Sequence, residues 1–171
     1  MTVRLRSLLL GGAGAIGAAL LCWQLTRLLS WIPAPADETA RLRLATAMLL
    51  PSVAVLMAML LVQMGARFIG GVFDPTAGQD FRLLVVNQRA ITNTVEQLAC
   101  FVPSLLALSL APVTVPGRTA LIAALGLTFA LARVVFWIGY LTAPLNRAPG
   151  MAATIVVTLV ALAAAARAWI G

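Results

Sequence analysis

The sequence of 171 residues contains no histidine, no lysine and only two cysteines. Without histidine, the chain lacks the side chain most often used as a general base and as a metal ligand. Cys22 and Cys100 lie alone in apolar runs, so the chain has no CxxC redox motif and no cysteine-based metal motif, and a structural disulfide is not expected. The sequence therefore predicts no metal site.

Charged residues are also scarce, at 10% of the chain, whereas hydrophobic residues make up 62%. A soluble domain of this length has no place for so much apolar surface, but a bilayer accommodates it. We therefore expect an all-α integral membrane protein. The formal net charge of +7 comes from twelve arginines against five acids. These arginines are scattered among apolar segments, which favours membrane topology and anion binding over nucleic-acid binding.

Five apolar segments, joined by short turns, are long enough to cross a bilayer. They cover residues 8–31, 44–64, 83–110, 119–141 and 151–170. The first follows two arginines, as a secretory signal does, but its length and its small residues favour a retained helix that packs closely on its neighbours. These small residues are Gly11, Gly14, Ala15 and Ala18. Pro51 lies near the predicted start of the second segment, where proline is tolerated.

The third segment is unusual because Arg89, Asn93 and Glu96 interrupt its apolar run. An α-helix turns about 100° per residue, so these side chains lie on one face. A charge at the bilayer centre costs roughly 2.5–3.5 kcal/mol on insertion scales, so such groups must face a partner helix, a cavity or a ligand. Two interpretations follow: an intrahelical or interhelical Arg89–Glu96 pair that sets the packing register, or a polar ligand site at the membrane edge.

Polar side chains from several segments are expected at one membrane face, because the ends of segments two and four lie beside the starts of segments three and five. The expected set is Arg67, Arg82, Arg89, Asn93, Glu96, Arg133, Tyr140 and Arg147. The arginine distribution weakly favours the cytoplasm for this face. The absence of lysine suggests a GC-rich bacterial genome, so we expect a bacterial inner membrane. Four tryptophans are expected as interfacial belt residues, namely Trp23, Trp31, Trp137 and Trp169.

Three stretches of the chain resemble the MAPEG family, the membrane-associated proteins of eicosanoid and glutathione metabolism. Residues 87–96 are similar to the family pattern Arg-Ala-x-x-Asn-x-x-Glu. Residues 132–147 are similar to the end of the third family helix and its turn. Arg67 with residues 72–75 is similar to the end of the first family helix. Together these stretches place a family-like region over residues 42–171.

The resemblance implies a four-helix transmembrane bundle over residues 42–171, with residues 1–36 as an additional N-terminal transmembrane helix and turn. It also implies a homotrimer that holds glutathione between neighbouring subunits. The implied glutathione-binding residues are Arg67, Arg89, Asn93, Glu96, Arg133 and Tyr140. Arg147 is the implied catalytic residue that holds the thiolate, and Tyr140 is a second catalytic candidate as a donor to the sulfur.

The sequence thus predicts a membrane-embedded transferase or peroxidase with glutathione as co-substrate and an apolar electrophile or lipid hydroperoxide as second substrate. Arginine forks suit the carboxylates of glutathione, and Glu96 suits its ammonium group. Two alternatives stay open. One is a non-catalytic family member that binds lipid or a partner protein, because Ile91 stands where several members have a polar residue. The other is a small transporter, which is disfavoured because no polar residue is expected midway along segments one, two and five.

Overall fold

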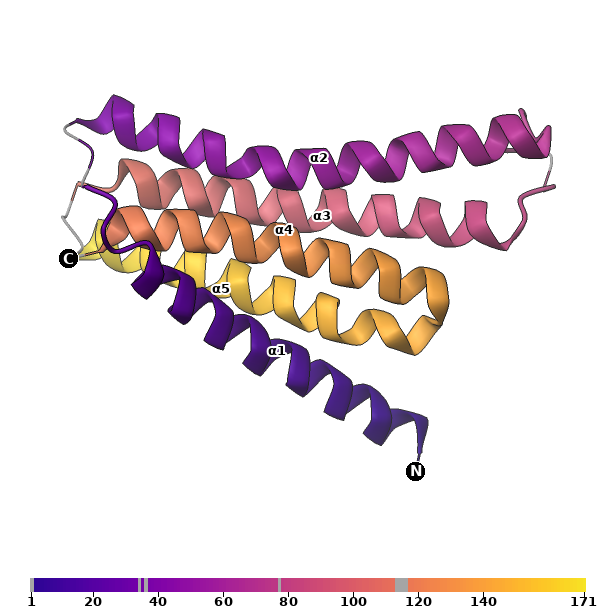
Figure 1. The fold of residues 1–171 in the computed structure, drawn as a ribbon, viewed down its shortest axis with the longest axis horizontal. Helices are drawn as coiled ribbons and strands as arrows, with labels where there is room; N and C mark the ends of the chain where they lie inside the picture. The colour runs from indigo at the N-terminus through magenta and orange to yellow at the C-terminus, as the bar shows by residue number, and fades with distance from the viewer. Residues whose placement is uncertain (1, 34, 36, 77, 113–116) are drawn as a thin grey trace.

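The computed structural model describes residues 2–33, 35, 37–76, 78–112 and 117–171, which form a bundle of long helices (Figure 1). The helices are α1 (Val3–Leu28), α2 (Glu38–Gly70), α3 (Arg82–Leu110), α4 (Arg118–Thr142), a short 3-10 helix η1 (Pro144–Arg147) and α5 (Ala148–Ile170). Five stretches of helix are long and apolar enough to cross a bilayer, and the described residues contain no strand. The all-α membrane fold predicted from the sequence is confirmed.

The two longest helices, α2 and α3, exceed the length that a bilayer requires by the widest margin. At about 1.5 Å per residue, the 33 residues of α2 measure about 50 Å, whereas the hydrocarbon core is about 30 Å thick. Figure 1 shows the hairpin of α2 and α3 extending at one end beyond the turn between α4 and α5. We therefore expect the first turns of α3 to reach the headgroup level of the membrane, where a water-soluble ligand has access.

The start of α2 differs from the sequence prediction. The Asp37 side chain caps the helix by accepting a backbone amide hydrogen bond at 2.6 Å, so α2 begins at Glu38 and not near residue 44. Pro51 consequently lies inside the helix instead of near its start. At the other end Gly71 has a φ of +66°, the left-handed conformation that glycine adopts readily at helix ends.

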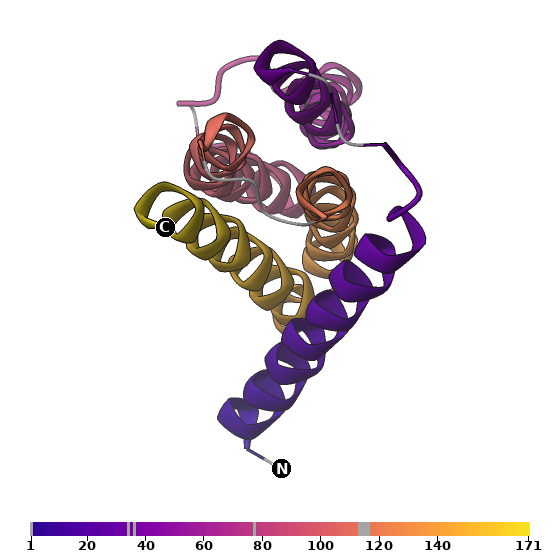
Figure 2. The ribbon, with the colours of Figure 1, turned by 90° about the vertical axis from the view of Figure 1, so that its left-hand side faces the viewer.

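α4 is the most buried helix and contacts the other four (Figure 2). Phe129 of α4 stacks on Phe101 of α3, with ring centroids 4.1 Å apart. Gly126 allows α2 to approach closely, since a β-carbon there would lie 2.6 Å from the Met48 carbonyl oxygen. Many large apolar side chains on the outer faces of the bundle remain exposed, as expected for helices that face lipid.

α1 packs on α4 and α5 and crosses them obliquely (Figure 2). Small side chains form its contact face: Ala18 and Cys22 are buried, and Gly14 lies against the start of α5. The close packing predicted from the small residues of this segment is therefore present. Cys22 and Cys100 are both free thiols.

Candidate functional site

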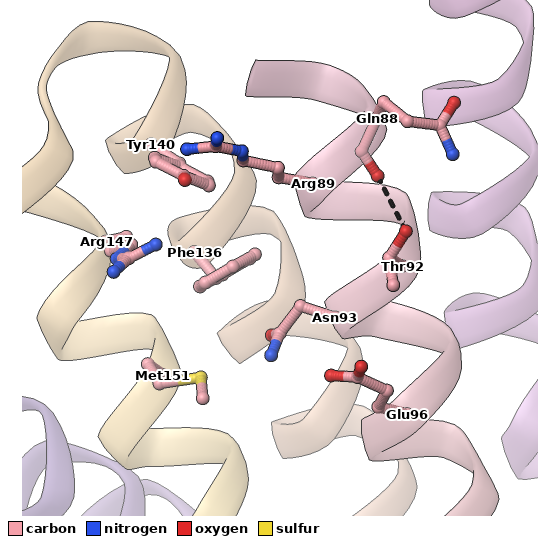
Figure 3. Close-up of a pocket in the computed structure, with 9 residues that line it drawn as sticks. All are labelled: Gln88, Arg89, Thr92, Asn93, Glu96, Phe136, Tyr140, Arg147 and Met151. Atoms are coloured by element: carbon pink, nitrogen blue, oxygen red, sulfur yellow. Dashed lines mark hydrogen bonds between the residues drawn. The ribbon is translucent and has the colours of Figure 1, made fainter. Parts of the chain in front are cut away.

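The polar face of α3 lines a cavity of about 470 Å³ between α3, α4 and the start of α5 (Figure 3). The lining residues are Gln88, Arg89, Thr92, Asn93, Glu96, Phe136, Tyr140, Arg147 and Met151. The structure thus brings together most of the site residues predicted from the sequence. Arg67 and Arg133 are the two that do not line the cavity.

The charged groups around the cavity are not paired with one another. Arg89 and Glu96 are both exposed, and their side chains form no ion pair or hydrogen bond with any residue that the structure describes. Seven residues separate them, about 10 Å along the helix axis, so the intrahelical pair considered from the sequence does not form. Among the described residues, Glu96 is the only acid that lines the cavity, and no cluster of three metal-binding side chains occurs.

Arg133 lies behind the cavity wall with 0% of its surface exposed. Its Nη1 and Nη2 atoms both donate to Asn93 Oδ1 at 3.2 Å, and Nη2 also donates to Thr94 Oγ1 at 2.7 Å. Its guanidinium lies 4.0 Å from the centroid of the Phe136 ring. These bonds occupy the carbonyl oxygen of Asn93 and leave the amide NH2 group to face a ligand. Arg133 therefore orients Asn93 from behind and does not reach the cavity itself.

Arg147 lies on the side of the cavity opposite Asn93 and Glu96 (Figure 3). Its guanidinium is 4.6 Å from the centroid of the Tyr140 ring, a distance typical of a cation–π contact. The η1 turn brings Arg147 back beside α4 because Gly139 has no side chain: a β-carbon there would overlap the Asn146 backbone. The tight turn thus sets the height of Arg147 relative to the Tyr140 ring.

Arg67 lies outside the cavity, at the end of α2. Its Nη1 and Nη2 atoms donate to the two carboxylate oxygens of Asp80 at 3.0 and 3.1 Å, a bidentate ion pair that ties α2 to the segment before α3. Arg82 has a similar bridging contact, since its Nη2 atom donates to the Thr142 carbonyl oxygen at 3.3 Å. Within one chain, both arginines join helices and neither lines the cavity.

A family model described as the MAPEG family matches residues 44–167. The chain belongs to the MAPEG family. A search of the curated proteins found no match, and a search of the solved structures found none either. The matched residues of this MAPEG protein include α3, α4, η1 and most of α2 and α5, and therefore the whole cavity. α1 lies outside the match, so it is an addition to the family unit.

The sequence analysis did not identify four residues that line the cavity: Gln88, Thr92, Phe136 and Met151. Gln88 and Thr92 precede Glu96 by two turns and one turn of α3, so a helical projection that includes uncharged polar side chains identifies both. Thr92 Oγ1 donates to the Gln88 carbonyl oxygen at 3.1 Å (Figure 3). Ile91, by contrast, is buried and turned away from the cavity. Position 91 therefore contributes no side chain to the cavity of this chain.

A second polar cluster in the MAPEG unit joins α2, α3 and α4. Asn87 is completely buried; its Nδ2 atom donates to Gln63 Oε1 at 2.9 Å, and its Oδ1 atom accepts a bond from Trp137 Nε1 at 2.7 Å. The indole nitrogen of the half-buried Trp137 thus bonds within the bundle, and its interfacial belt position stays a prediction. Such a satisfied polar cluster fixes the relative height of three helices.

Buried polar side chains also occur within α2 and α5, and because Ser52 and Thr158 lie near the middle of these segments, the expectation of none midway along them is wrong. They are Ser52, Gln63, Thr154 and Thr158. Gln63 Nε2 donates to the Leu84 carbonyl oxygen, and both threonine hydroxyls donate to carbonyl oxygens of their own helix. Ser52 Oγ has no hydrogen-bond partner among the described residues. Because the other three groups bond within the bundle, these side chains do not form the row of free polar groups that lines a transport path.

Proposed function

We propose that this MAPEG protein is a membrane-embedded, glutathione-dependent transferase or peroxidase. One observation supports the proposal above all: Arg89, Glu96 and Arg147 surround one cavity, and none of their side chains has a hydrogen-bond or ion-pair partner among the described residues. Two cations and one anion around a single space are complementary to a ligand that carries the opposite charges. Glutathione carries two carboxylates, one ammonium group and a thiol.

In this proposal an extended tripeptide lies along α3. Arg89 holds the carboxylate at one end, and Glu96 holds the ammonium group of the γ-glutamyl residue about 10 Å away along the helix. The Asn93 NH2 group, oriented by Arg133, donates to the carboxylate beside that ammonium group. The thiol in the middle of the peptide then faces Arg147, which lies opposite Asn93 in the cavity (Figure 3).

The proposed chemistry depends on the thiolate, because only the deprotonated sulfur is a good nucleophile. A guanidinium beside the sulfur lowers the pKa of the thiol, which is the role we assign to Arg147, and the Tyr140 hydroxyl donates a hydrogen bond to the same atom. In transfer, the sulfur forms a bond to carbon of an apolar electrophile, and the leaving group departs with its electron pair. In peroxide reduction, the sulfur attacks a hydroperoxide oxygen, the alkoxide takes a proton, and a second glutathione forms the disulfide and releases water.

The proposed assembly is a homotrimer with glutathione between neighbouring subunits, as the family resemblance implies. Two observations support an intersubunit site. The charged side chains of the cavity are exposed in a single chain, and Arg67 lies at the end of α2 outside its own cavity, where it can serve a neighbour. The apolar second substrate would reach the thiolate from the bilayer. From the absence of lysine we infer a bacterial inner membrane, and from the distribution of arginines a cavity that faces the cytoplasm.

The proposal is tested by titrating the ultraviolet absorbance of the bound glutathione thiolate in detergent-purified protein. Wild type should hold the thiolate at a pH where free glutathione is still protonated. Arg147→Ala should shift the midpoint upward by about one to two pH units, the usual effect of one nearby opposite charge. Arg6→Ala is the matched control, because Arg6 is an exposed arginine of α1 at the same end of the bundle and does not line the cavity.

Turnover of a chromogenic aryl halide is measured on the same samples. Lost turnover in Arg147→Ala with glutathione binding retained supports the assigned role. An unchanged thiolate band in that variant removes Arg147 from the mechanism. Wild type that binds glutathione without any turnover would instead support the non-catalytic alternative, and wild type that binds no glutathione would reject the proposal.

A further inference from the structure

Two glycines bring backbones into contact at the corner between α4 and α5, which carries Arg147. Gly139 lies against Asn146, and Gly150 lies against Phe136. A β-carbon at either glycine would overlap the opposing backbone, so neither position has room for another residue. Both contacts fall within the residues that the family model matches.

A third backbone contact at this corner comes from α1. A β-carbon on Gly14 would overlap the backbone of Pro149, which follows Arg147 by two residues. Pro149 lies in the first turn of α5, beside the Gly150 that rests on α4. The first turn of α5 is therefore held by both α1 and α4.

We infer that α1 is a clamp that positions Arg147; this inference rests on the proposed role of Arg147 in holding the thiolate. α1 contributes no residue to the cavity, so its action on the ligand is indirect. By lying against Pro149, α1 limits the movement of η1 and of the first turn of α5 relative to α4. The family unit itself forms the corner between α4 and α5 through the close contacts of Gly139 and Gly150. α1 lies outside the family match and adds a third contact to that corner.

The position of this corner matters because few contacts hold the Arg147 side chain. Its guanidinium lies over the Tyr140 ring at 4.6 Å but has no hydrogen-bond partner in the described part of the chain. A hydrogen bond to a thiolate demands a defined distance and angle, and a misplacement of about 1 Å can cost about 100-fold in rate. A backbone fixed by neighbouring helices supplies the precision that side-chain contacts do not.

The test compares two glycine-to-alanine substitutions in α1 of the full-length protein in detergent. Gly14→Ala adds a β-carbon that overlaps the Pro149 backbone, whereas Gly12→Ala adds one with nothing within 4 Å. Both changes raise helix propensity equally, so only the contact with α5 differs. Hydrogen–deuterium exchange measures how often the corner opens, through the exchange rates of the backbone amides of residues 143, 146 and 148. These amides donate hydrogen bonds to carbonyl oxygens within the corner.

Gly14→Ala is expected to speed the exchange of these amides about tenfold, a ratio typical of overpacking a tight contact. It should also shift the titration of the bound thiolate toward that of free glutathione. Glutathione affinity should stay within about twofold, because the groups that hold the ends of the peptide belong to α3 and not to the corner. A protein that was only destabilised would lose glutathione affinity and the shifted thiolate titration together. Gly12→Ala should match wild type in all three measurements.

Gly11→Ala provides the opposite perturbation and keeps the inference testable if Gly14→Ala does not fold. Its β-carbon would lie 3.8 Å from that of Ala152, an ordinary contact that should tighten α1 on α5 and slow the exchange. The inference would be overturned if amide exchange at the corner were the same as in wild type in both Gly14→Ala and Gly11→Ala. It would also be overturned if the bound thiolate had the same titration midpoint in Gly14→Ala as in Gly12→Ala. If wild type held no bound thiolate, the proposed function would be overturned. The exchange measurement tests the clamp separately, because it needs no bound glutathione.

Discussion

Arginines at the two ends of the bundle have different surroundings. At the end where α3 finishes, Arg41 and Arg118 donate to carbonyl oxygens of the α3 C-terminus at 3.2 and 2.7 Å. The last carbonyls of a helix lack partners within the helix, so these two arginines complete the end of α3. At the cavity end, Arg89 and Arg147 have no hydrogen-bond partner among the described residues.

The comparison separates arginines that stabilise the fold from arginines that are available to a ligand. In the sequence both kinds are cations near the ends of apolar segments, and charge alone does not distinguish them. Their partners do, because a side chain already bonded to a helix end gives up that bond before it binds anything else. Substitutions in the two groups should therefore alter different measurements, stability for Arg41 and Arg118 and ligand affinity for Arg89 and Arg147.

The largest effect on binding is expected from Glu96→Gln, which removes the one acid among the described residues that line the cavity. Loss of a charged hydrogen bond to the ammonium group costs about 2–3 kcal/mol, or roughly 30- to 150-fold in Kd measured by calorimetry. A glutathione analogue without the amino group is the control and should bind wild type and variant equally. If Glu96→Gln lost the same affinity for glutathione and for the analogue, Glu96 would have a structural role. The charged groups of the cavity end would then not be free for a ligand.

A pair of arginine substitutions tests the comparison directly. Arg118→Ala should lower the free energy of unfolding by about 1–3 kcal/mol, because it leaves the Ala111 carbonyl oxygen without its partner, while glutathione affinity stays within about twofold. Arg89→Ala should weaken glutathione binding about tenfold with the melting temperature unchanged, because no bond within the chain is lost. Thermal unfolding and calorimetry on both variants measure the two effects. If both variants lost stability and affinity alike, the distinction would fail.

The polar face of α3 could be predicted from the sequence because helical geometry alone brings Arg89, Asn93 and Glu96 together. The membrane fold followed in the same way from the length of the apolar segments. The place of Arg133 could not be predicted, since spacing within α4 does not reveal that Asn93 and Thr94 of another helix take up its donors. Its separation from the cavity depends on tertiary contacts.

Two further differences have the same origin. α2 begins before its apolar run because a cap at Asp37 stabilises a polar first turn, which hydropathy does not detect. Trp137 lies near a span end, where a tryptophan can be a belt residue or a contact between helices. Its hydrogen bond to Asn87, fifty residues away in sequence, is a contact between helices that spacing within α4 does not reveal. Local patterns thus predicted the helices and one polar face, while bonds between helices determined which polar groups remain free.

The buried cluster around Asn87 provides an intermediate case with a smaller effect. Trp137→Phe keeps the ring but removes the donor to Asn87 Oδ1, so the free energy of unfolding should fall by about 1 kcal/mol while glutathione affinity is unchanged. Trp169→Phe is the matched control, because Trp169 Nε1 donates to the Ala107 carbonyl oxygen at an exposed position. It should have the weaker effect. Equal losses in chemical denaturation would mean that burial of the Asn87 cluster adds nothing.

The smallest effect is expected at Arg67, the arginine of the cavity end that is paired with an acid. Asp80→Asn and Arg67→Gln break the same part-buried pair, so each should lower the free energy of unfolding by about 0.5–1 kcal/mol. Both losses should shrink in 1 M salt, where the Debye length is about 3 Å. Only Arg67→Gln removes the cation that the proposed trimer offers to a neighbouring cavity, so only this variant should weaken glutathione binding. Equal affinities in the two variants would place Arg67 with the arginines that hold the fold.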